Sequence, residues 1–287
     1  MKIAILGTTG MLGSALLKYF SKTDHVIYSY SRDVEKAKRI IPTTNNVVFH
    51  RFDHFWLTQP NEFDYVINCV GIIKPLLKNE NYTEIVTAVD VNVRLPHKLA
   101  GHCCSHGTKI IQIATDCVYA GVHGPYNEKS LHDPTDVYGK TKSLGEVKYN
   151  NFFNLRCSII GKEFESKLSL LEWFLSQPDK SNLNGYTNHL WNGISCLQFA
   201  KICDNIINNN IQLPNLLHVV PKDSVSKYGL LNLFKKYYQR DLSISASGTA
   251  TPVNRTLSTL YTDLNEKIWN NDILTIEEMI AEMVIFA

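Results

Sequence analysis

Three residues near the middle of the chain could together deliver a proton to a carbonyl group. Tyr138 and Lys142 are four positions apart in YGKTK, and residues at this spacing share one face of a helix. A phenol with a pKa of about 10 is a weak acid at neutral pH, and a nearby ammonium is expected to lower that pKa. Thr115, in ATDCVYAG, adds a hydroxyl donor. The set predicts general acid catalysis at a carbonyl carbon that accepts a hydride.

A thiol lies close to this hydroxyl in the sequence. Cys117 follows Thr115 by two positions, and residues at this spacing in an extended segment point to the same face. We therefore expect Cys117 to face the substrate if Thr115 does. A thiol with a pKa of about 8.5, lower beside a cation, could remove a hydrogen next to a keto group. Alternatively, Cys117 is a small buried hydrophobic residue, as free cysteines often are.

The N-terminus contains a glycine pattern typical of a dinucleotide site. A short run of β-forming residues, 2–6, is followed by GTTGMLGSALLKYF, in which apolar residues recur at helical spacing. The N–H groups at the start of such a helix face the phosphates, and the glycines permit a tight turn and a close approach of the backbone. The alternative is a glycine-rich turn that binds nothing. The predicted cofactor contacts here are Gly7, Thr9, Gly10, Met11, Leu12 and Gly13.

The end of the second predicted strand, 25–30, bears on the choice of cofactor. A site that prefers NAD places an acid there to bind the ribose hydroxyls, whereas this chain has Ser31 and Arg32. A hydroxyl and a guanidinium suit the 2′-phosphate of NADP. The pattern therefore favours NADPH, unless Arg32 is a solvated loop residue.

Strand-like and helical segments alternate behind these motifs. Strands are predicted at 65–69, 109–114, 153–160 and 216–220, and helices at 83–103, 138–147 and 194–208. This alternation predicts the α/β class, with a Rossmann-like doubly wound parallel sheet. Ligands of such sheets bind beyond the carboxyl ends of the strands, where ATDCVYAG falls.

Composition argues against several other classes. The chain has 287 residues, a net charge of +2 and 20% charged residues, which gives no reason to expect nucleic acid or a membrane as a partner. Its N-terminus does not resemble a signal peptide. The seven cysteines include no CxxC pair, so we expect reduced thiols, a cytoplasmic protein and no metal site.

The motifs GTTGMLG, NCVG, ATDCVYAG, GPYNE and YGKTK, in this order, resemble the extended short-chain dehydrogenase/reductases. Within that family the chain looks most like the dTDP-4-dehydrorhamnose reductases, chiefly over residues 114–146. The resemblance implies a Thr115, Tyr138 and Lys142 triad, NADPH/NADP as cofactor and a nucleotide-diphospho-4-keto-6-deoxyhexose as substrate. A homodimer is a further family expectation. Asn68 and Gly71 would lie at the cofactor, as would Tyr138 and Lys142.

The resemblance also implies a division of the chain. Residues 1–160 plus 194–221 would form the NADP-binding domain, and residues 161–193 plus 222–287 a smaller α/β substrate-binding domain. Asn92 would lie near the active site, or would simply cap local backbone. The predicted substrate contacts are Lys74, Trp191, Asn192 and Arg255, with Arg255 as a diphosphate clamp; Trp173 and Tyr186 are further candidates. Each could instead be a core or loop residue.

Cys117 departs from the plain reductases, which carry an aromatic residue there. GDP-fucose synthases and plant bifunctional UDP-rhamnose epimerase/reductases have a cysteine at this position, where it transfers a proton during epimerisation. This likeness implies 3,5-epimerisation of a UDP- or dTDP-linked 4-keto-6-deoxyglucose, followed by 4-keto reduction to NDP-L-rhamnose. Lys167, or else Lys162, would be the second acid, although either could bind diphosphate or be solvated. The alternatives are a reductase served by a separate epimerase, and a non-catalytic NADP-binding regulatory subunit.

Overall fold

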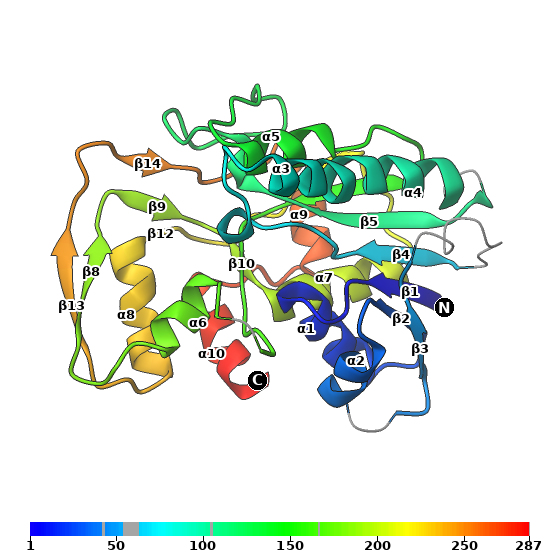
Figure 1. The fold of residues 1–287 in the computed structure, drawn as a ribbon, viewed down its shortest axis with the longest axis horizontal. Helices are drawn as coiled ribbons and strands as arrows, with labels where there is room; N and C mark the ends of the chain where they lie inside the picture. The colour runs from blue at the N-terminus through cyan, green and yellow to red at the C-terminus, as the bar shows by residue number, and fades with distance from the viewer. Residues whose placement is uncertain (42–43, 54–62, 104–105, 166, 287) are drawn as a thin grey trace.

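The computed structural model describes residues 1–41, 44–53, 63–103, 106–165 and 167–286. Within them, seven parallel strands form one sheet in the order β11-β6-β5-β4-β1-β2-β3 (Figure 1). The order runs outward in both directions from the β4–β1 pair, as in doubly wound folds, and confirms the predicted Rossmann-like class. The strands are β1 (Lys2–Leu6), β2 (Val26–Ser31), β3 (Val47–Arg51), β4 (Tyr65–Asn68), β5 (Lys109–Ala114), β6 (Phe152–Arg156) and β11 (Leu216–His218).

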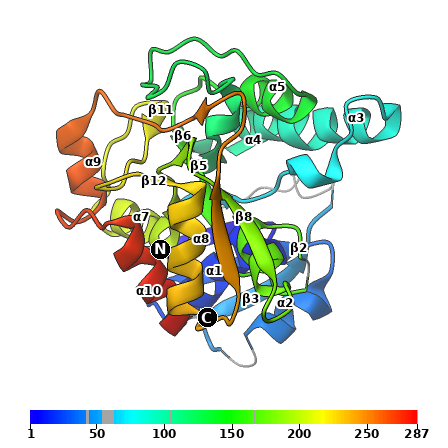
Figure 2. The same cartoon turned by 90° about the vertical axis from the view of Figure 1, so that its left-hand side faces the viewer.

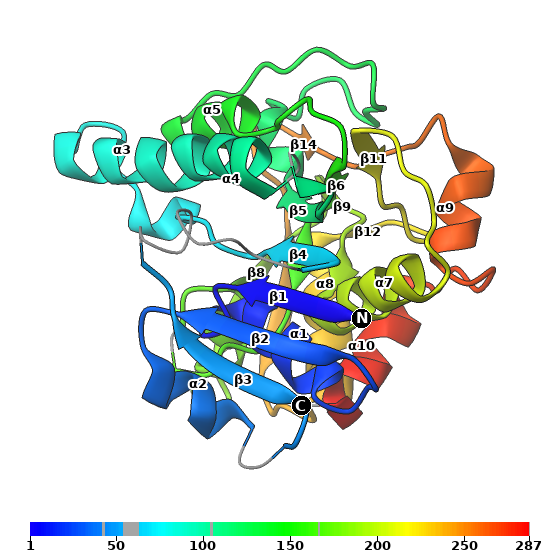
Figure 3. The ribbon, with the colours of Figure 1, turned by 90° about the vertical axis from the view of Figure 1, so that its right-hand side faces the viewer.

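Both faces of this sheet are covered by helices, because the central strands are apolar on both sides. In β1, Ile3 and Ile5 belong to one buried cluster and Ala4 and Leu6 to the other, as the alternation of a strand requires. Helices α1 (Met11–Phe20) and α7 (Cys196–Asn208) pack on the first face. Helix α4 (Leu95–Cys103) packs on the second, with α3 (Tyr82–Val89) and α5 (Val137–Leu144) in the same layer (Figure 3).

The expected elements of the large sheet are largely confirmed, although several elements of the structure were not predicted. The predicted strands at 2–6 and 109–114 match β1 and β5, and the predicted helix at 83–103 is continuous through α3, the π-helical turn Asp90–Arg94 and α4. Strand β3 and helix α2 (Val34–Ile40) were not predicted. Strand β3 is an edge strand with no fully buried residue, and its apolar run is limited to Val47, Val48 and Phe49.

A second group of short strands lies beyond the carboxyl ends of the large sheet (Figures 1 and 2). Strand β8 (Asn182–Tyr186) pairs with β13 (Ser243–Ser247), and α8 (Lys227–Tyr237) packs on both. Strand β9 (His189–Trp191) lies between β12 (Val225–Ser226) and β14 (Val253–Asn254). The remaining elements are α6 (Leu170–Leu175), β7 (Ile159–Ile160), β10 (Ile194–Ser195), α9 (Thr262–Ile268) and α10 (Ile276–Phe286).

Helices α9 and α10 return to the large sheet, where both pack against α7. Among the described helices, none combines the length and the apolar character needed to span a membrane.

Candidate functional site

The glycine turn after β1 forms a cradle of bare backbone. Gly7 has φ +83° and Gly10 N–H donates to Gly7 O at 3.0 Å, which closes the turn. A Cβ on Gly13 would overlap Gly7 O and lie 2.7 Å from Gly7 C, so α1 can approach β1 this closely only with glycine there. No side chain caps the start of α1, where Gly10 is exposed. Uncapped N–H groups beside an open turn fit a pyrophosphate.

The end of β2 lies next to this cradle, since Gly7 N–H donates to Tyr30 O at 2.8 Å. The Thr8 and Ser29 hydroxyls are 2.9 Å apart and join the two strand ends. Ser31 is buried and donates its hydroxyl to Asp33 O at 2.7 Å, while Arg32 is exposed. An exposed guanidinium at this strand end is compatible with a 2′-phosphate.

The predicted contacts after β4 include two asparagines that hold the backbone in place. Asn68 donates to the Gln112 side chain at 2.9 Å and accepts from Val70 N–H at 3.1 Å. Asn92 exchanges two hydrogen bonds with the backbone of Ile72, at 2.9 and 3.1 Å, and also donates to the Thr141 hydroxyl at 3.1 Å. Asn92 therefore ties the turn after β4 to α5, which is the backbone-capping alternative. Gly71 is exposed on that turn.

Thr115 and Cys117 lie together, but not for the predicted reason. Thr115 is extended, with φ −134° and ψ 147°, whereas Asp116–Val118 forms a 3-10 turn, so the alternation of a strand does not apply to Cys117. Instead, the Thr115 hydroxyl caps that turn by accepting from Cys117 N–H at 3.2 Å. The cap holds the two residues side by side.

Helix α5 brings the tyrosine and the lysine to the same place. Asp136 caps its start by accepting from Gly139 N–H at 2.8 Å. The Thr115 hydroxyl interacts with the Tyr138 phenol, as does Cys117. Lys142 is only 8% exposed and donates to Ile113 O, at the end of β5, at 3.0 Å. The structure thus brings Thr115, Tyr138 and Lys142 to the carboxyl end of β5.

The expectation of a lowered pKa for Tyr138 was wrong for this arrangement. Burial raises the pKa of Tyr138, and the neighbouring Cys117 raises it further, while the Thr115 hydroxyl lowers it. Burial also lowers the pKa of Lys142, and Glu146 partly offsets that. Tyr138 is therefore protonated at neutral pH and available as an acid.

The expectation of a readily ionised thiol was wrong as well. Burial and the charge of Asp116 raise the pKa of Cys117 to about 12, against the smaller effects of the Thr115 hydroxyl, Arg255 and Lys74. Asp116 is itself 9% exposed, and burial raises the pKa of its carboxyl group. Thr115 donates to Asp116 Oδ1 at 3.2 Å. Asp116 lies between Thr115 and Cys117 in the sequence, and its charge disfavours the thiolate form of Cys117.

The residues predicted to contact the substrate form ion pairs or hydrogen bonds with other parts of the chain. Lys74 forms an ion pair with Asp136 at 2.7 Å beside the start of α5. Arg255 donates to Tyr119 O at 2.7 Å and Ala120 O at 3.0 Å, so it anchors the segment after the 3-10 turn. Asn192 exchanges hydrogen bonds with the backbone of Leu257, at 2.7 and 2.9 Å.

Trp191 is buried and donates to the Ser158 hydroxyl at 2.8 Å. Trp173 and Tyr186 are exposed on α6 and β8. Arg255, Asn192 and Trp191 thus form hydrogen bonds that join segments of the chain distant from one another in the sequence.

The lysine chosen from the sequence as second acid is not brought to Cys117 by any contact observed among the described residues. Lys167 is exposed, and Lys162 lies over the Tyr238 ring. A lysine that sequence reasoning missed lies closer to the site. Lys227, the first residue of α8, has its Nζ 5.6 Å from the centre of the Trp191 ring and interacts electrostatically with Asp116 and Cys117. Nothing in the local sequence marks Lys227, because the pairing of β12 with β9 places it there.

Within the described part of the chain, no three histidine, cysteine or acidic side chains are grouped as a metal site would require.

A family model described as the RmlD substrate binding domain matches residues 1–161, which is more than half of the chain. The chain belongs to this family. Among curated relatives, the methionine adenosyltransferase 2 subunit beta of Bos taurus is 30% identical over 147 residues, covering 50% of this RmlD-family chain and 41% of the bovine protein. The dTDP-4-dehydrorhamnose reductase of Aggregatibacter actinomycetemcomitans is 29% identical over 146 residues, covering 50% and 45%. The match therefore spans less than half of each relative.

Solved structures resemble the whole RmlD-family chain. A dTDP-4-dehydrorhamnose reductase from Bacillus anthracis, in complex with NADP, has a TM-score of 0.76 at 17% identity and covers 100% of this chain and 99% of that one. This likeness extends the shared fold past residue 161 to the segments that carry Trp191, Lys227 and Arg255.

Proposed function

We propose that this chain uses NADPH to reduce the 4-keto group of a nucleoside-diphospho-6-deoxyhexose. The observation that carries the proposal is the placement of Thr115, Tyr138 and Lys142 at the carboxyl end of β5. This end lies on the same side of a parallel sheet as the glycine turn, so a cofactor cradled at the turn could reach it. Reductases named for this reaction share the family region and the fold.

Each residue of the triad has a distinct role in this reaction. Tyr138 donates its phenolic proton to the C4 oxygen as that oxygen gains charge, and burial keeps the phenol protonated until then. Thr115 would turn its hydroxyl proton from Asp116 to the same oxygen and donate a hydrogen bond to it. Lys142 supplies positive charge that offsets the phenolate left behind. NADPH, when bound, supplies the hydride that C4 accepts.

The cofactor and the substrate would occupy different parts of the chain. The uncapped start of α1 would hold the pyrophosphate of NADPH and Arg32 its 2′-phosphate. The bound NADP of the Bacillus anthracis structure supports this choice of cofactor. We assign the sugar nucleotide to the predicted domain of residues 161–193 and 222–287, and within it to the part before α9 that lies beyond the strand ends. Lys227 from this part and the predicted Lys74 from the turn after β4 would each provide a cation for the diphosphate.

NADPH oxidation with dTDP- and UDP-4-keto-6-deoxyhexoses tests this proposal. The wild-type chain should turn over at least one of them, and Tyr138→Phe should lower kcat by about 100-fold or more, the scale of general acid catalysis. Tyr82→Phe is the matched control, because Tyr82 is 80% exposed on α3. Equal kcat values for Tyr138→Phe and the control would contradict the assigned role of Tyr138.

A second activity, 3,5-epimerisation, is favoured by the position of Cys117 beside Thr115 and Tyr138. Because the pKa of the thiol is raised to about 12, Cys117 would act only once the substrate or a cation offsets the charge of Asp116. Lys227 is better placed than Lys167 to be the second acid. In D₂O without NADPH, the wild-type chain would then exchange hydrogen at C3 and C5 of the keto sugar, and Cys117→Ser would not. If the wild-type chain exchanges no hydrogen at C3 or C5, the epimerase proposal is wrong and only the reductase proposal stands.

The third candidate is a regulatory subunit that binds NADP without turnover. The names of several curated relatives, methionine adenosyltransferase 2 subunit beta, favour it. It predicts tight NADPH binding with no oxidation by any 4-keto sugar nucleotide. The same oxidation assay therefore separates it from the reductase.

A further inference from the structure

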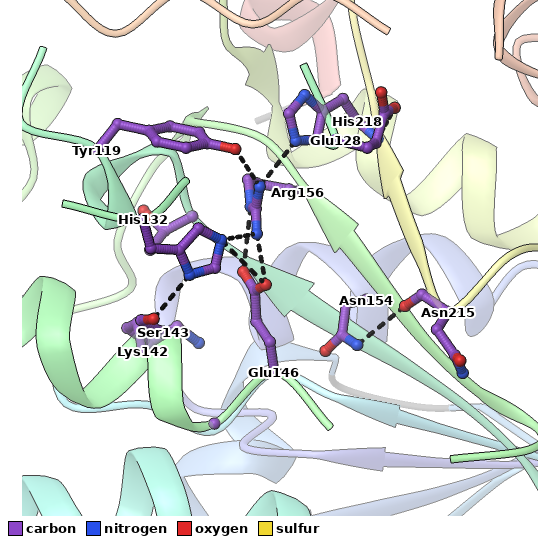
Figure 4. Close-up of polar contacts among 12 residues, drawn as sticks. Tyr119, Glu128, His132, Lys142, Ser143, Glu146, Asn154, Arg156, Asn215 and His218 are labelled. Atoms are coloured by element: carbon purple, nitrogen blue, oxygen red, sulfur yellow. Dashed lines mark hydrogen bonds and ion pairs between the residues drawn. The ribbon is translucent and has the colours of Figure 1, made fainter. Parts of the chain in front are cut away.

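Most buried polar groups of this structure are met by other groups of the protein. Arg156, at the end of β6, is fully buried, and its charge needs partners there. Figure 4 shows its guanidinium in contact with the side chains of Glu146, Tyr119, His132 and His218. Such pairing is the rule in proteins, because a buried polar group without a partner has lost its hydrogen bonds to water and gained none in exchange.

Two exceptions to this rule belong to residues of one cavity. Among the described residues, five buried polar side-chain atoms have no hydrogen-bond partner, and two of them are Gln198 Oε1 and Trp269 Nε1. Gln198, on α7, is 4% exposed, and Trp269, which follows α9, is 3% exposed. Both residues line a cavity of about 420 Å³, within the range of about 300–1,000 Å³ that small-molecule sites occupy. The residues of this cavity thus offer an N–H donor and a carbonyl acceptor that the protein does not use.

The cavity lies along α7, on the face of the sheet that α1 and α7 cover. Its lining follows α7 from Gln198 to Asn209, a rise of about 17 Å, and both α9 and α10 pack beside α7 (Figure 3). Asn210, next to Asn209, accepts from the Tyr65 hydroxyl at 3.4 Å and from Lys109, and these are the first residues of β4 and β5. This part of the cavity is therefore near the amino ends of the strands, whereas the triad lies at the carboxyl end of β5.

The lining of the cavity is rich in side-chain amides, which can both donate and accept hydrogen bonds. These amides are Gln198, Asn205, Asn208, Asn209 and Asn270. Asn208 donates to Asp204 at 3.0 Å and Asn209 donates to Asn205 at 2.7 Å, so the carbonyl oxygens of both remain available as acceptors. Because Asn208, Asn209 and Asn270 are exposed, they form the rim of the cavity, and the buried Gln198 and Trp269 form its inner part.

The charged residues of the lining are mostly paired within the protein. The lining contains one cation, Lys201, which forms an ion pair with Glu282 at 2.8 Å. Asp204 accepts from the Tyr19 hydroxyl at 3.1 Å. Asp272 is the remaining carboxylate, and it is exposed. The cavity therefore offers no unpaired positive charge to a phosphate or carboxylate ligand, and its amides favour a neutral ligand.

We propose that this cavity binds a neutral polyhydroxylated ligand of the size of a mono- or disaccharide. A sugar hydroxyl donates one hydrogen bond and accepts others, so one sugar ring can accept from Trp269 Nε1 and donate to Gln198 Oε1 and to the carbonyl oxygens of the rim. An apolar ligand would leave both buried atoms without a partner. The proposal is independent of the reductase function, because no residue of the lining belongs to the triad or to the predicted cofactor contacts.

The indole N–H of Trp269 reports binding directly, and its NMR signal is assigned by its loss in Trp269→Phe. The probes are D-glucose, L-rhamnose and sucrose, each titrated into the ¹⁵N-labelled chain. We expect at least one of them to shift the Trp269 signal in a saturable way, with a Kd of about 10 mM or tighter. Glycine betaine, which has no hydroxyl group and no N–H group, is the control for a general solvent effect and should give no saturable shift.

Gln198→Met separates a role in binding from a role in folding, because it removes the amide and nearly keeps the length of the side chain. Since Gln198 Oε1 has no partner in the protein, we expect the variant to unfold at the same or a higher urea concentration and to bind the sugar at least tenfold more weakly. Gln212→Met, exposed and outside the lining, is the matched control and should change neither. If Gln198→Met does not fold, Asn208→Ala at the rim replaces it and should weaken binding severalfold.

The inference is overturned if none of the three sugars gives a saturable shift of the Trp269 signal up to about 100 mM. A saturable shift of the same size with glycine betaine would overturn it as well, as would unchanged sugar affinity in the folded variant of Gln198 or Asn208. Because these measurements need no turnover, their outcome does not depend on whether any keto sugar is reduced.

Discussion

Gly10→Ala separates cofactor binding from folding. Gly10 is exposed, has φ −84° and ψ 172°, and a Cβ there would meet only Gly7 O, at 3.5 Å, an ordinary contact. Alanine adopts this backbone without strain and restricts the unfolded chain, so we expect stability to rise by about 0.4–1 kcal/mol. The same methyl group stands at the mouth of the cradle, where the pyrophosphate must approach the backbone.

We therefore expect Gly10→Ala to weaken NADPH binding at least tenfold, about 1.4 kcal/mol, while the chain unfolds at the same or higher urea concentration. Two further variants calibrate the result. Gly13→Ala must push α1 away from Gly7 and should cost about 1–3 kcal/mol of stability as well as binding. Gly101→Ala, on α4 with nothing within 4 Å of the added Cβ, should lose neither.

The assays are urea unfolding and the fluorescence of NADPH titrated with protein. The reasoning fails if Gly10→Ala binds NADPH as tightly as the wild type. It also fails if Gly10→Ala is destabilised as much as Gly13→Ala, because the turn would then be a packing feature.

Three other outcomes follow from the geometry. Burial and the charge of Arg156 lower the pKa of His218 from 6.5 to about 4, so the unfolded chain binds more protons between these values. The stability that neutral His218 contributes is complete above pH 6.5 and is lost as the pH falls toward 4. Between pH 7 and pH 5 the free energy of unfolding, measured in urea, should therefore fall by about 2 kcal/mol more in the wild type than in His218→Gln. Lys227→Met should raise KM for the sugar nucleotide severalfold and leave the Kd for NADPH unchanged, and equal KM values would remove Lys227 from the site. Asn92→Ala loses three hydrogen bonds and should lower the free energy of unfolding by about 1–3 kcal/mol, measured in urea, whereas an unchanged value would show that the turn after β4 does not need its tie to α5.

Local patterns predicted the elements that carry strong periodicity. Strands β1 and β5 are nearly continuous apolar runs because both of their faces are buried, so their limits could be found in the sequence. The glycine turn and the Tyr138–Lys142 pair were predicted in the same way, since their spacing within a turn or a helix fixes their geometry. Strand β3 was missed because its apolar run is short and none of its residues is fully buried.

Features set by tertiary contacts could not be found in this way. Lys227 directly follows β12, and β12 pairs with β9, about 36 positions earlier in the chain. Only this pairing brings Lys227 near enough to interact electrostatically with Cys117. The pKa of Cys117 depends on its burial and on the charge of Asp116. Neither effect can be inferred from the two-residue spacing of Thr115 and Cys117. The expectation of a lowered pKa for Tyr138 failed likewise, because burial of the phenol, which spacing does not encode, is the largest cause of its shift.

The fate of the hydride tests the central claim most directly. NADPH labelled with deuterium at the transferable position of its nicotinamide would be incubated with the chain and a dTDP- or UDP-4-keto-6-deoxyhexose, and the product sugar examined by mass spectrometry and NMR. The proposed reductase places one deuterium on C4, and Tyr138→Phe forms that product at least about 100-fold more slowly. Bound NADPH with no deuterium at C4 of either sugar would contradict the account.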